Sequence, residues 1–144
     1  MDDRVGGLRH VPRGVLSSDT GQTLGMQRRE AISGRRTGAR DLWMGESRML
    51  PGAQSGNHHH GESETAIYVL SGHPVFVFCE GDRERRIETS PGDYVFVPAF
   101  APHREENPSG EEAAVILARS TQEAIVVNLS RLVATEAGES SSGA

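Results

Sequence analysis

Short apolar runs, each bounded by turn-forming residues, fill the middle of the chain. They are rich in Val, Ile, Phe and Tyr, and Gly, Pro, Asp or Ser separates one run from the next, which is typical of β-strands joined by tight turns. We expect strands at residues 31–34, 41–45, 47–50, 65–71, 74–80, 85–90, 93–98, 113–120 and 124–130. Residues 130–137 carry a weak helical period. Many short strands and almost no helix predict an all-β fold, an antiparallel sandwich or barrel.

Two four-residue breaks, SGHP at 71–74 and SPGD at 90–93, interrupt this strand pattern. In the second break Pro91 fixes its own φ and Gly92 can adopt a positive φ, as a tight turn requires. We expect both breaks to be hairpin corners.

The two ends of the chain differ in composition from the middle. Residues 1–22 are rich in Gly, Arg, Asp and Ser, and residues 135–144 have no hydrophobic periodicity. We therefore predict an N-terminal arm at 1–22 with one short strand at 10–16, a barrel at 23–134, and a disordered tail at 135–144. An isolated small barrel leaves strand edges exposed. The arm would cover such an edge on a neighbouring subunit, which predicts a homodimer, through its apolar residues Leu8, Val11, Val15 and Leu16.

Composition and charge exclude several classes of function. With 144 residues and a net charge of -5, the chain forms one domain and has no basic stripe for nucleic acid. All fifteen basic residues are Arg, which removes mechanisms that need a lysine nucleophile. Cys79 is the single cysteine, so no internal disulfide forms, and we expect it to be a buried apolar residue. No signal peptide and no apolar run of about 20 residues is present, so we expect a soluble, cytoplasmic protein without membrane partners.

Three of the six histidines stand together in the segment GNHHHGESE. Alternate side chains of a strand share a face, so His58 and His60 would project together, about 6.5 Å apart along the chain, with His59 on the other face. His103 follows a second Gly-strand-Pro segment and would supply a third imidazole if the two segments pair. Imidazole ligands suit a divalent transition metal, with zinc and iron(II) first and manganese, nickel or copper as alternatives. For the remaining histidines we expect polar surface positions: His10, His59 and His73.

These two segments resemble the two motifs of the cupin superfamily, over about residues 40–130. The first motif, G-x5-H-x-H-x3/4-E-x6-G, is similar to Gly52, His58, His60 and Glu64. The second, G-x5-P-x-G-x2-H-x3-N, is similar to Gly92, Pro98, His103 and Asn107. The resemblance implies an antiparallel double-stranded β-helix, a jelly-roll barrel, with one metal ion per chain. It implies the ligand set His58, His60, Glu64 and His103, although some members of the fold have lost their ion.

The chain departs from the family pattern in two places. Seven residues, not six, separate Glu64 from Gly72, so counting back from the glycine places the ligand at Thr65 instead. We choose Glu64, with a bulge in the following strand absorbing the extra residue and Glu62 in reserve. Phe100 replaces the usual glycine before His103, so we expect a bulkier corner that walls the pocket.

Other side chains are candidates for catalysis or for substrate binding. Strand alternation after His103 points Glu105 towards the metal as a general base, and a solvated corner is the alternative reading. Arg119 or Arg104 would pair with a substrate carboxylate. Most aromatic residues, Phe76, Phe78 and Phe96 among them, would lie in the core. The candidate aromatic substrate contacts are Trp43, Tyr68 and Phe100.

The metal site predicts an enzyme acting on a small molecule, by proton transfer next to the carbonyl of a 2-oxo acid. The segments at 25–34, 39–45, 58–72 and 91–109 resemble small actinobacterial cupins that include metal-dependent epimerases of a methylated indolepyruvate in antibiotic biosynthesis. That resemblance implies a tautomerase or epimerase. Two alternatives stay open: an iron-dependent dioxygenase, and a non-catalytic binding module whose ion is structural.

Overall fold

The computed structural model describes residues 4, 5 and 7–132 of the chain. The tail predicted at 135–144 lies outside the described residues, as does most of the weak helical pattern at 130–137. Within the described part no helix is long and apolar enough to cross a membrane.

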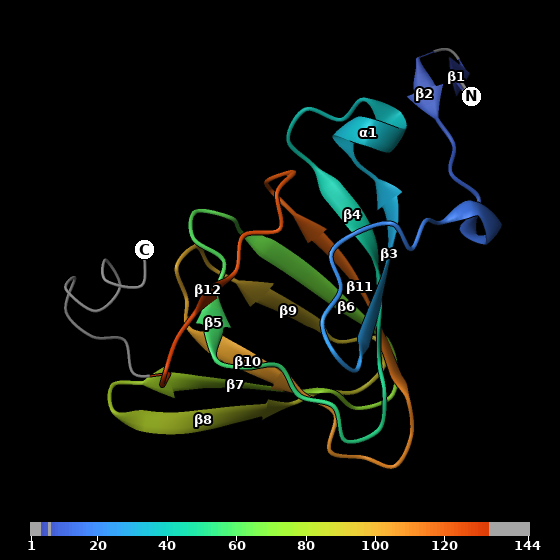
Figure 1. Ribbon diagram of the computed structural model, residues 1–144. Coiled ribbons are helices and arrows are strands. Elements are labelled where there is room, and N and C mark those ends of the chain that lie inside the picture. The colour runs from blue at the N-terminus through green and yellow to red at the C-terminus, as the bar shows by residue number, and fades with distance from the viewer. Residues whose placement is uncertain (1–3, 6, 133–144) are drawn as a thin grey trace.

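Two five-stranded antiparallel sheets make up the body of the molecule. The first has the order β3 (Met26–Ile32), β4 (Trp43–Met49), β11 (Ala113–Arg119), β6 (Thr65–Ser71) and β9 (Tyr94–Val97). The second has the order β12 (Val127–Asn128), β5 (His58–His59), β10 (His103–Glu106), β7 (Val75–Glu80) and β8 (Arg83–Glu88). Figure 1 shows β7, β8 and β10 lying across from β3, β4 and β11 as the two layers of a jelly roll. The predicted all-β jelly-roll class is confirmed.

Alternation of buried and exposed side chains places the core between the two sheets. Along β6 the residues Ile67 and Val69 are buried, and they pack with residues of both sheets. Because alternate side chains of a strand point to opposite faces, the intervening Tyr68 is directed away from this core. The cluster consists of Ile67, Val69, Phe76, Val97 and Val115.

Both predicted hairpin corners carry the chain from one sheet to the other. The break at 71–74 joins β6 of the first sheet to β7 of the second, and the break at 90–93 joins β8 to β9. The hairpin expectation is therefore wrong, because a jelly roll passes its strands between layers. Gly72 has φ 79°, and a Cβ there would lie 2.7 Å from the Cβ of Ala113, so the corner needs glycine.

The strand expected at 31–34 is only the end of a longer strand. The strand is β3, which ends at Ile32, and a single helical turn, α1 (Gly34–Thr37), follows it. Ser33 caps this turn, since its Oγ accepts a hydrogen bond from the backbone N–H of Arg36 at 3.1 Å. The expected strands at 41–45 and 47–50 are one strand, β4, and the run at 124–130 forms only the short β12.

The N-terminal region runs along the edge of the first sheet. It contains the small hairpin β1 (Arg4–Val5) and β2 (Leu8–Arg9), which Figure 1 shows reaching away from the sheets, and a 3-10 turn, η1 (Arg13–Val15), in place of the strand expected at 10–16. Ser17 then exchanges two backbone hydrogen bonds with Glu30 of β3, at 3.0 and 2.7 Å. Residues 20–23, which follow this pairing, line a cavity. The homodimer stays a prediction.

Candidate metal centre

Three histidine rings meet at one end of the barrel. His58 of β5 lies directly opposite His103 of β10 in the antiparallel register, and His60 follows β5 by one residue. Ring centroids are 4.7 Å apart for His58 and His60, 4.5 Å for His58 and His103, and 5.1 Å for His60 and His103. One ring nitrogen from each lies within 4.8 Å of the others. The structure thus brings together the three histidines that strand alternation and pairing predicted.

Backbone carbonyl groups fix the tautomer of all three rings. The Nδ1 atoms of His58 and His103 each contact the carbonyl oxygen two residues earlier in the chain, at 2.7 and 3.0 Å, and Nδ1 of His60 contacts the carbonyl of Ile125 at 2.8 Å. A carbonyl oxygen only accepts, so each Nδ1 must carry the proton. Every Nε2 therefore keeps a free lone pair, as in metal-ligating histidines whose other nitrogen donates to the protein.

Burial favours the neutral form of two of these rings. It lowers the pKa of His58, and it lowers the pKa of His60 to about 4, although the bond to Ile125 acts the other way. Burial acts in the same direction on His103, but contact with the carboxylate of Glu105 outweighs it and raises the pKa of that ring. Nε2 of His103 is buried and has no hydrogen-bond partner in the described part of the chain.

These observations meet the requirements of a divalent transition metal site. An orphaned buried nitrogen with a lone pair is unfavourable unless something binds it. Three imidazoles that converge in this way suit Zn, Fe, Mn, Ni or Cu and leave other coordination positions open. The residues that would hold the ion are His58, His60 and His103.

Glu64, predicted as the fourth ligand, does not join the cluster. Its side chain is exposed, whereas Thr65, the first residue of β6, is buried and faces the cavity. The predicted bulge is present, because the pairing of β6 with β11 skips Leu70. Even so, the phase of β6 directs Thr65 inward and Glu64 outward, so the Glu64 assignment is corrected. Glu62 is exposed as well.

Glu105 brings a carboxylate to the cluster from β10 instead. Its Oε2 lies 3.6 Å from Nε2 of His103. Burial opposes ionisation, but the contact with His103 and then the nearby charges of His58 and Arg28 outweigh it and lower the pKa of Glu105 to about 2. The neighbouring Glu106 faces the other way and pairs with arginines of the outer surface. The orientation predicted for Glu105 is therefore found, and its role as a base stays a prediction.

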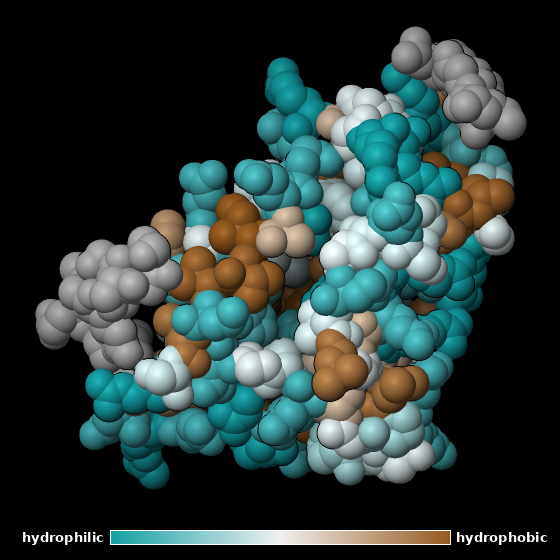
Figure 2. Space-filling model, viewed as in Figure 1, coloured by the Kyte–Doolittle hydropathy of each residue, from teal (hydrophilic) through white to brown (hydrophobic). Residues whose placement is uncertain are grey.

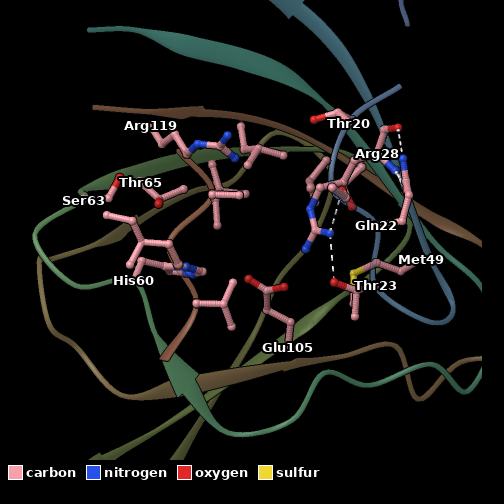
Figure 3. A pocket seen from close by; sticks show the side chains of 18 of the residues that line it. Thr20, Gln22, Thr23, Arg28, Met49, His60, Ser63, Thr65, Glu105 and Arg119 are labelled. Carbon is pink, nitrogen blue, oxygen red and sulfur yellow. Dashed lines mark hydrogen bonds between the residues drawn. The ribbon is translucent and has the colours of Figure 1, made fainter. Parts of the chain in front are cut away.

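A cavity of about 280 Å³ adjoins the cluster. His60, Glu105, Arg28 and Arg119 all line it, and Figure 3 shows Glu105 between His60 and Arg28, with Arg119 across the cavity. Residues 20–23 and 124–126 flank the cavity, and Figure 2 shows the surface hollowed between the N-terminal segment and the segment that leads to β12. The walls near β6 and β11 are mainly apolar, from Ile67, Val115 and Leu117.

Of the four residues predicted to contact substrate, only Arg119 lines the cavity. Trp43 lies beneath it, with the guanidinium carbon 4.0 Å from the ring centroid, and its Nε1 donates to Glu30 at 3.0 Å. Tyr68 faces out and contacts Tyr94, with ring centroids 5.0 Å apart.

Phe100, the fourth, is 60% exposed and packs its ring 5.8 Å from that of His59. It has φ 62°, the left-handed conformation that the family glycine would adopt, so it keeps the turn without walling the pocket. Trp43, Tyr68 and Phe100 are thus corrected as substrate contacts: Trp43 is under Arg119, and the other two point outward. Arg104 lies outside the cavity, where it bonds to Glu106 at 2.7 Å.

Three further residues were misplaced or missed in the sequence-based prediction. His59 is on the opposite face from the cluster as expected, but it is buried and its Nδ1 accepts a hydrogen bond from the backbone of Gly61 at 2.9 Å. Phe96, expected in the core, is 60% exposed. Arg28 was missed because the polar run of β3 masked its alternation, which the buried Met26 and Glu30 at either side now reveal.

Comparison with known proteins places this site in a family. The family model described as Cupin domain matches residues 45–119, which include all three histidines. The structure resembles the polyketide cyclase RemF from Streptomyces resistomycificus, with 25% identity, a TM-score of 0.72, and 87% of this chain and 89% of that chain covered.

It also resembles two oxalate decarboxylases in fold. The Lactobacillus farciminis enzyme has 21% identity and a TM-score of 0.64, with 76% of this chain and 32% of that chain covered. The Bacillus subtilis enzyme, described with Mn(II) centres, has 19% identity and a TM-score of 0.65, with 78% and 30% covered. The chain thus spans about a third of their length. No curated protein matches it in sequence.

Proposed function

The chain belongs to the cupin domain family, and from that we propose that it is a metal-dependent enzyme that moves a proton next to the carbonyl group of a small 2-oxo acid. One observation carries the proposal: three Nε2 lone pairs converge beside an ionised carboxylate at the end of a cavity. Solved structures of similar fold are metal-dependent enzymes and a polyketide cyclase, which supports catalysis over a purely structural ion.

The histidines would hold a divalent ion, and zinc, iron(II) and manganese all suit the donor set. Such an ion, when bound, supplies a Lewis acid that polarises a carbonyl oxygen and makes the adjacent carbon more acidic, an effect of several kcal/mol. His58 and His60 are suited to this role because burial keeps their rings neutral.

Glu105 would then accept the proton. Its low pKa keeps it ionised across the neutral range, and its Oε2 lies 3.6 Å from Nε2 of His103, beside the nitrogens that would hold the ion. Proton return to the same carbon on the opposite face inverts that centre, and return to another atom moves the double bond. The apolar side chains of Ile67, Val115 and Leu117 line the same cavity and would disfavour water there.

Arg119 would bind an acidic group of the substrate. Trp43 supports its guanidinium from below, and two backbone carbonyls of residues 121 and 122 orient it, which leaves donors directed at the cavity. The finer form of the proposal, epimerisation at the β-carbon of a methylated indolepyruvate, is supported by the sequence resemblance alone. The likeness to a polyketide cyclase supports a second candidate, ring closure of a polyketone, which also begins with proton removal beside a carbonyl.

Deuterium uptake tests the proposal directly. Zinc-loaded and iron(II)-loaded protein is incubated in D2O with a panel of 2-oxo acids, with and without oxygen, and the proton signals at the carbon beside the carbonyl are followed by NMR. We expect metal-dependent exchange that is indifferent to oxygen. Product formation only with iron(II) and O2 would assign a dioxygenase, and binding without exchange of any acid would assign a binding module; both results contradict the proposal.

A further inference from the structure

The cavity is positively charged although the chain as a whole carries a net charge of -5. Arg28 from β3 and Arg119 from β11 both line it, and Figure 3 shows their guanidinium groups directed into the same space as His60 and Glu105. Glu105 is the one acidic residue among the described lining residues. A single carboxylate that already lies against His103 cannot neutralise two guanidinium groups.

Arg28 is anchored at one nitrogen and free at its others. Its Nη1 donates to Oγ1 of Thr23 at 2.9 Å and lies 3.4 Å from the carbonyl oxygen of Gly21. Within residues 7–132 no carboxylate oxygen lies within 4 Å of its guanidinium nitrogens, and neither Nε nor Nη2 has a hydrogen-bond acceptor. Its charge nevertheless reaches the metal end, because it contributes to the low pKa of both Glu105 and His58.

Arg119 is fixed more firmly and is equally without a carboxylate partner in the described part of the chain. Its Nε and Nη2 donate to the carbonyls of Thr121 and Gln122 at 3.1 and 2.9 Å, and its plane stacks on Trp43. Burial, and then the charge of Arg28, lower its pKa to about 10. The two guanidinium groups repel each other across the cavity, and a bound anion would offset this repulsion.

We propose that Arg28 and Arg119 form a subsite for a carboxylate at the end of the substrate that lies away from the histidines, so that the substrate is a diacid whose 2-oxo acid end faces the histidine cluster. This rests on the proposed function for the identity of the histidine end. A 2-oxo acid bound through its carbonyl and adjacent carboxylate brings no charge to the far end, whereas a second carboxylate accepts hydrogen bonds from both guanidinium groups. The subsite therefore favours diacids over mono-acids such as an indolepyruvate.

A matched ligand pair tests the subsite by binding. 2-Oxoglutarate and its 5-methyl ester share one carbon chain, but the second carries a neutral ester in place of the distal carboxylate. Calorimetric titration of both into the zinc-loaded protein should show the diacid binding at least about tenfold more tightly. In Arg28→Gln the two ligands should bind within about threefold of each other, and Arg28→Lys should restore part of the preference.

A control variant separates the effect of Arg28 from the loss of any nearby charge. Arg29→Gln removes the neighbouring arginine of β3, which is directed away from the cavity to the carbonyl of Arg13, and should keep the preference. Equal binding of the two ligands by the natural protein, binding of neither, or a preference that survives in Arg28→Gln contradicts the subsite. Deuterium exchange is a separate measurement, so a diacid that binds without exchanging contradicts the proposed function and leaves the subsite standing.

Discussion

The histidine end of the cavity carries three converging imidazole rings, whereas the arginine end carries two guanidinium groups without carboxylate partners among the described residues. The first end belongs to the sheet that contains β5 and β10, and the second to the sheet that contains β3 and β11. A ligand that spans the cavity would therefore contact both layers of the jelly roll. The sheet with β5 and β10 would provide the reacting centre. The sheet with β3 and β11 would bind the charged group of the substrate.

The two ends also differ in what holds them. Backbone carbonyls hold each histidine ring, and the carbonyl that holds His60 belongs to Ile125, 65 residues along the chain. Two backbone carbonyls hold Arg119 as well, and it also stacks on Trp43, which donates to the buried Glu30. The comparison teaches that main-chain contacts orient the histidine rings, whereas the arginine end depends on side-chain packing in addition.

The largest effect should follow from removing the carboxylate at the histidine end. Glu105→Gln keeps the shape but cannot accept a proton, so we expect the exchange rate to fall by about 10²–10⁴-fold. The matched control is Glu106→Gln, one residue along β10 on the other face, which should exchange at near the natural rate. Deuterium uptake followed by NMR gives both rates, and equal rates for the two variants would remove Glu105 from the mechanism.

The second largest effect should follow from truncating Trp43, the residue beneath Arg119, and it should appear as a lower free energy of unfolding. Trp43 is 2% exposed, so Trp43→Ala should destabilise the protein by about 3–5 kcal/mol through the lost burial and the cavity left behind. Trp43→Phe keeps a ring under the guanidinium but loses the hydrogen bond to Glu30. It should lower the free energy of unfolding by less than the alanine variant does. Chemical denaturation measures both, and a loss below about 1 kcal/mol for the alanine variant would contradict the support role.

Acid should weaken the same network through Glu30. Burial raises the pKa of this carboxyl, but hydrogen bonds from Ser33, Trp43 and Arg35 outweigh it, and the net pKa in the folded protein lies below the unfolded value. The resulting stabilisation is complete above the unfolded pKa, near 4.3, and is lost as the pH falls through the lower folded pKa. Denaturation at pH 7 and below pH 4 should show a larger decrease for the natural protein than for Glu30→Gln. Parallel decreases would show that Glu30 contributes nothing.

The smallest effect should follow from changing Glu64, which the comparison with the cupin motif assigns as a metal ligand. Glu64→Ala should leave metal content and affinity unchanged, because its side chain is exposed and outside the cluster. Thr65→Glu places a carboxylate at the inward position and should tighten metal binding. Competition with a chromophoric chelator measures both affinities, and weaker binding by Glu64→Ala would return Glu64 to the ligand set.

The sequence was informative where local rules decide the outcome. Period-two alternation placed His58 and His60 on one face and directed Glu105 inward, and the resemblance to the two cupin motifs added His103. The choice between Glu64 and Thr65 was not accessible, because it depends on the phase of β6, which its pairing with β11 and the skipped Leu70 determine.

Arg28 was hidden for a related reason. It stands in the polar run Gln27–Glu30, which has the composition of a surface segment, and only pairing with β4 and with Ser17 makes that run a strand with a buried face. The outward position of Tyr68 likewise follows from strand phase, not from its aromatic character. Long-range pairing thus decides which polar and aromatic residues face the cavity.

Metal analysis of a matched pair of variants tests the central claim most directly. The protein is purified without added metal, and its content of zinc, iron, manganese, nickel and copper is measured for the natural chain, for His103→Gln and for His73→Gln, whose histidine is exposed and far along the chain from the cluster. The three-histidine account predicts about one transition metal ion per chain in the natural protein and in His73→Gln, and a near-complete loss in His103→Gln. Metal-free natural protein that also fails to take up zinc, iron(II) or manganese on dialysis, or full occupancy in His103→Gln, would contradict it.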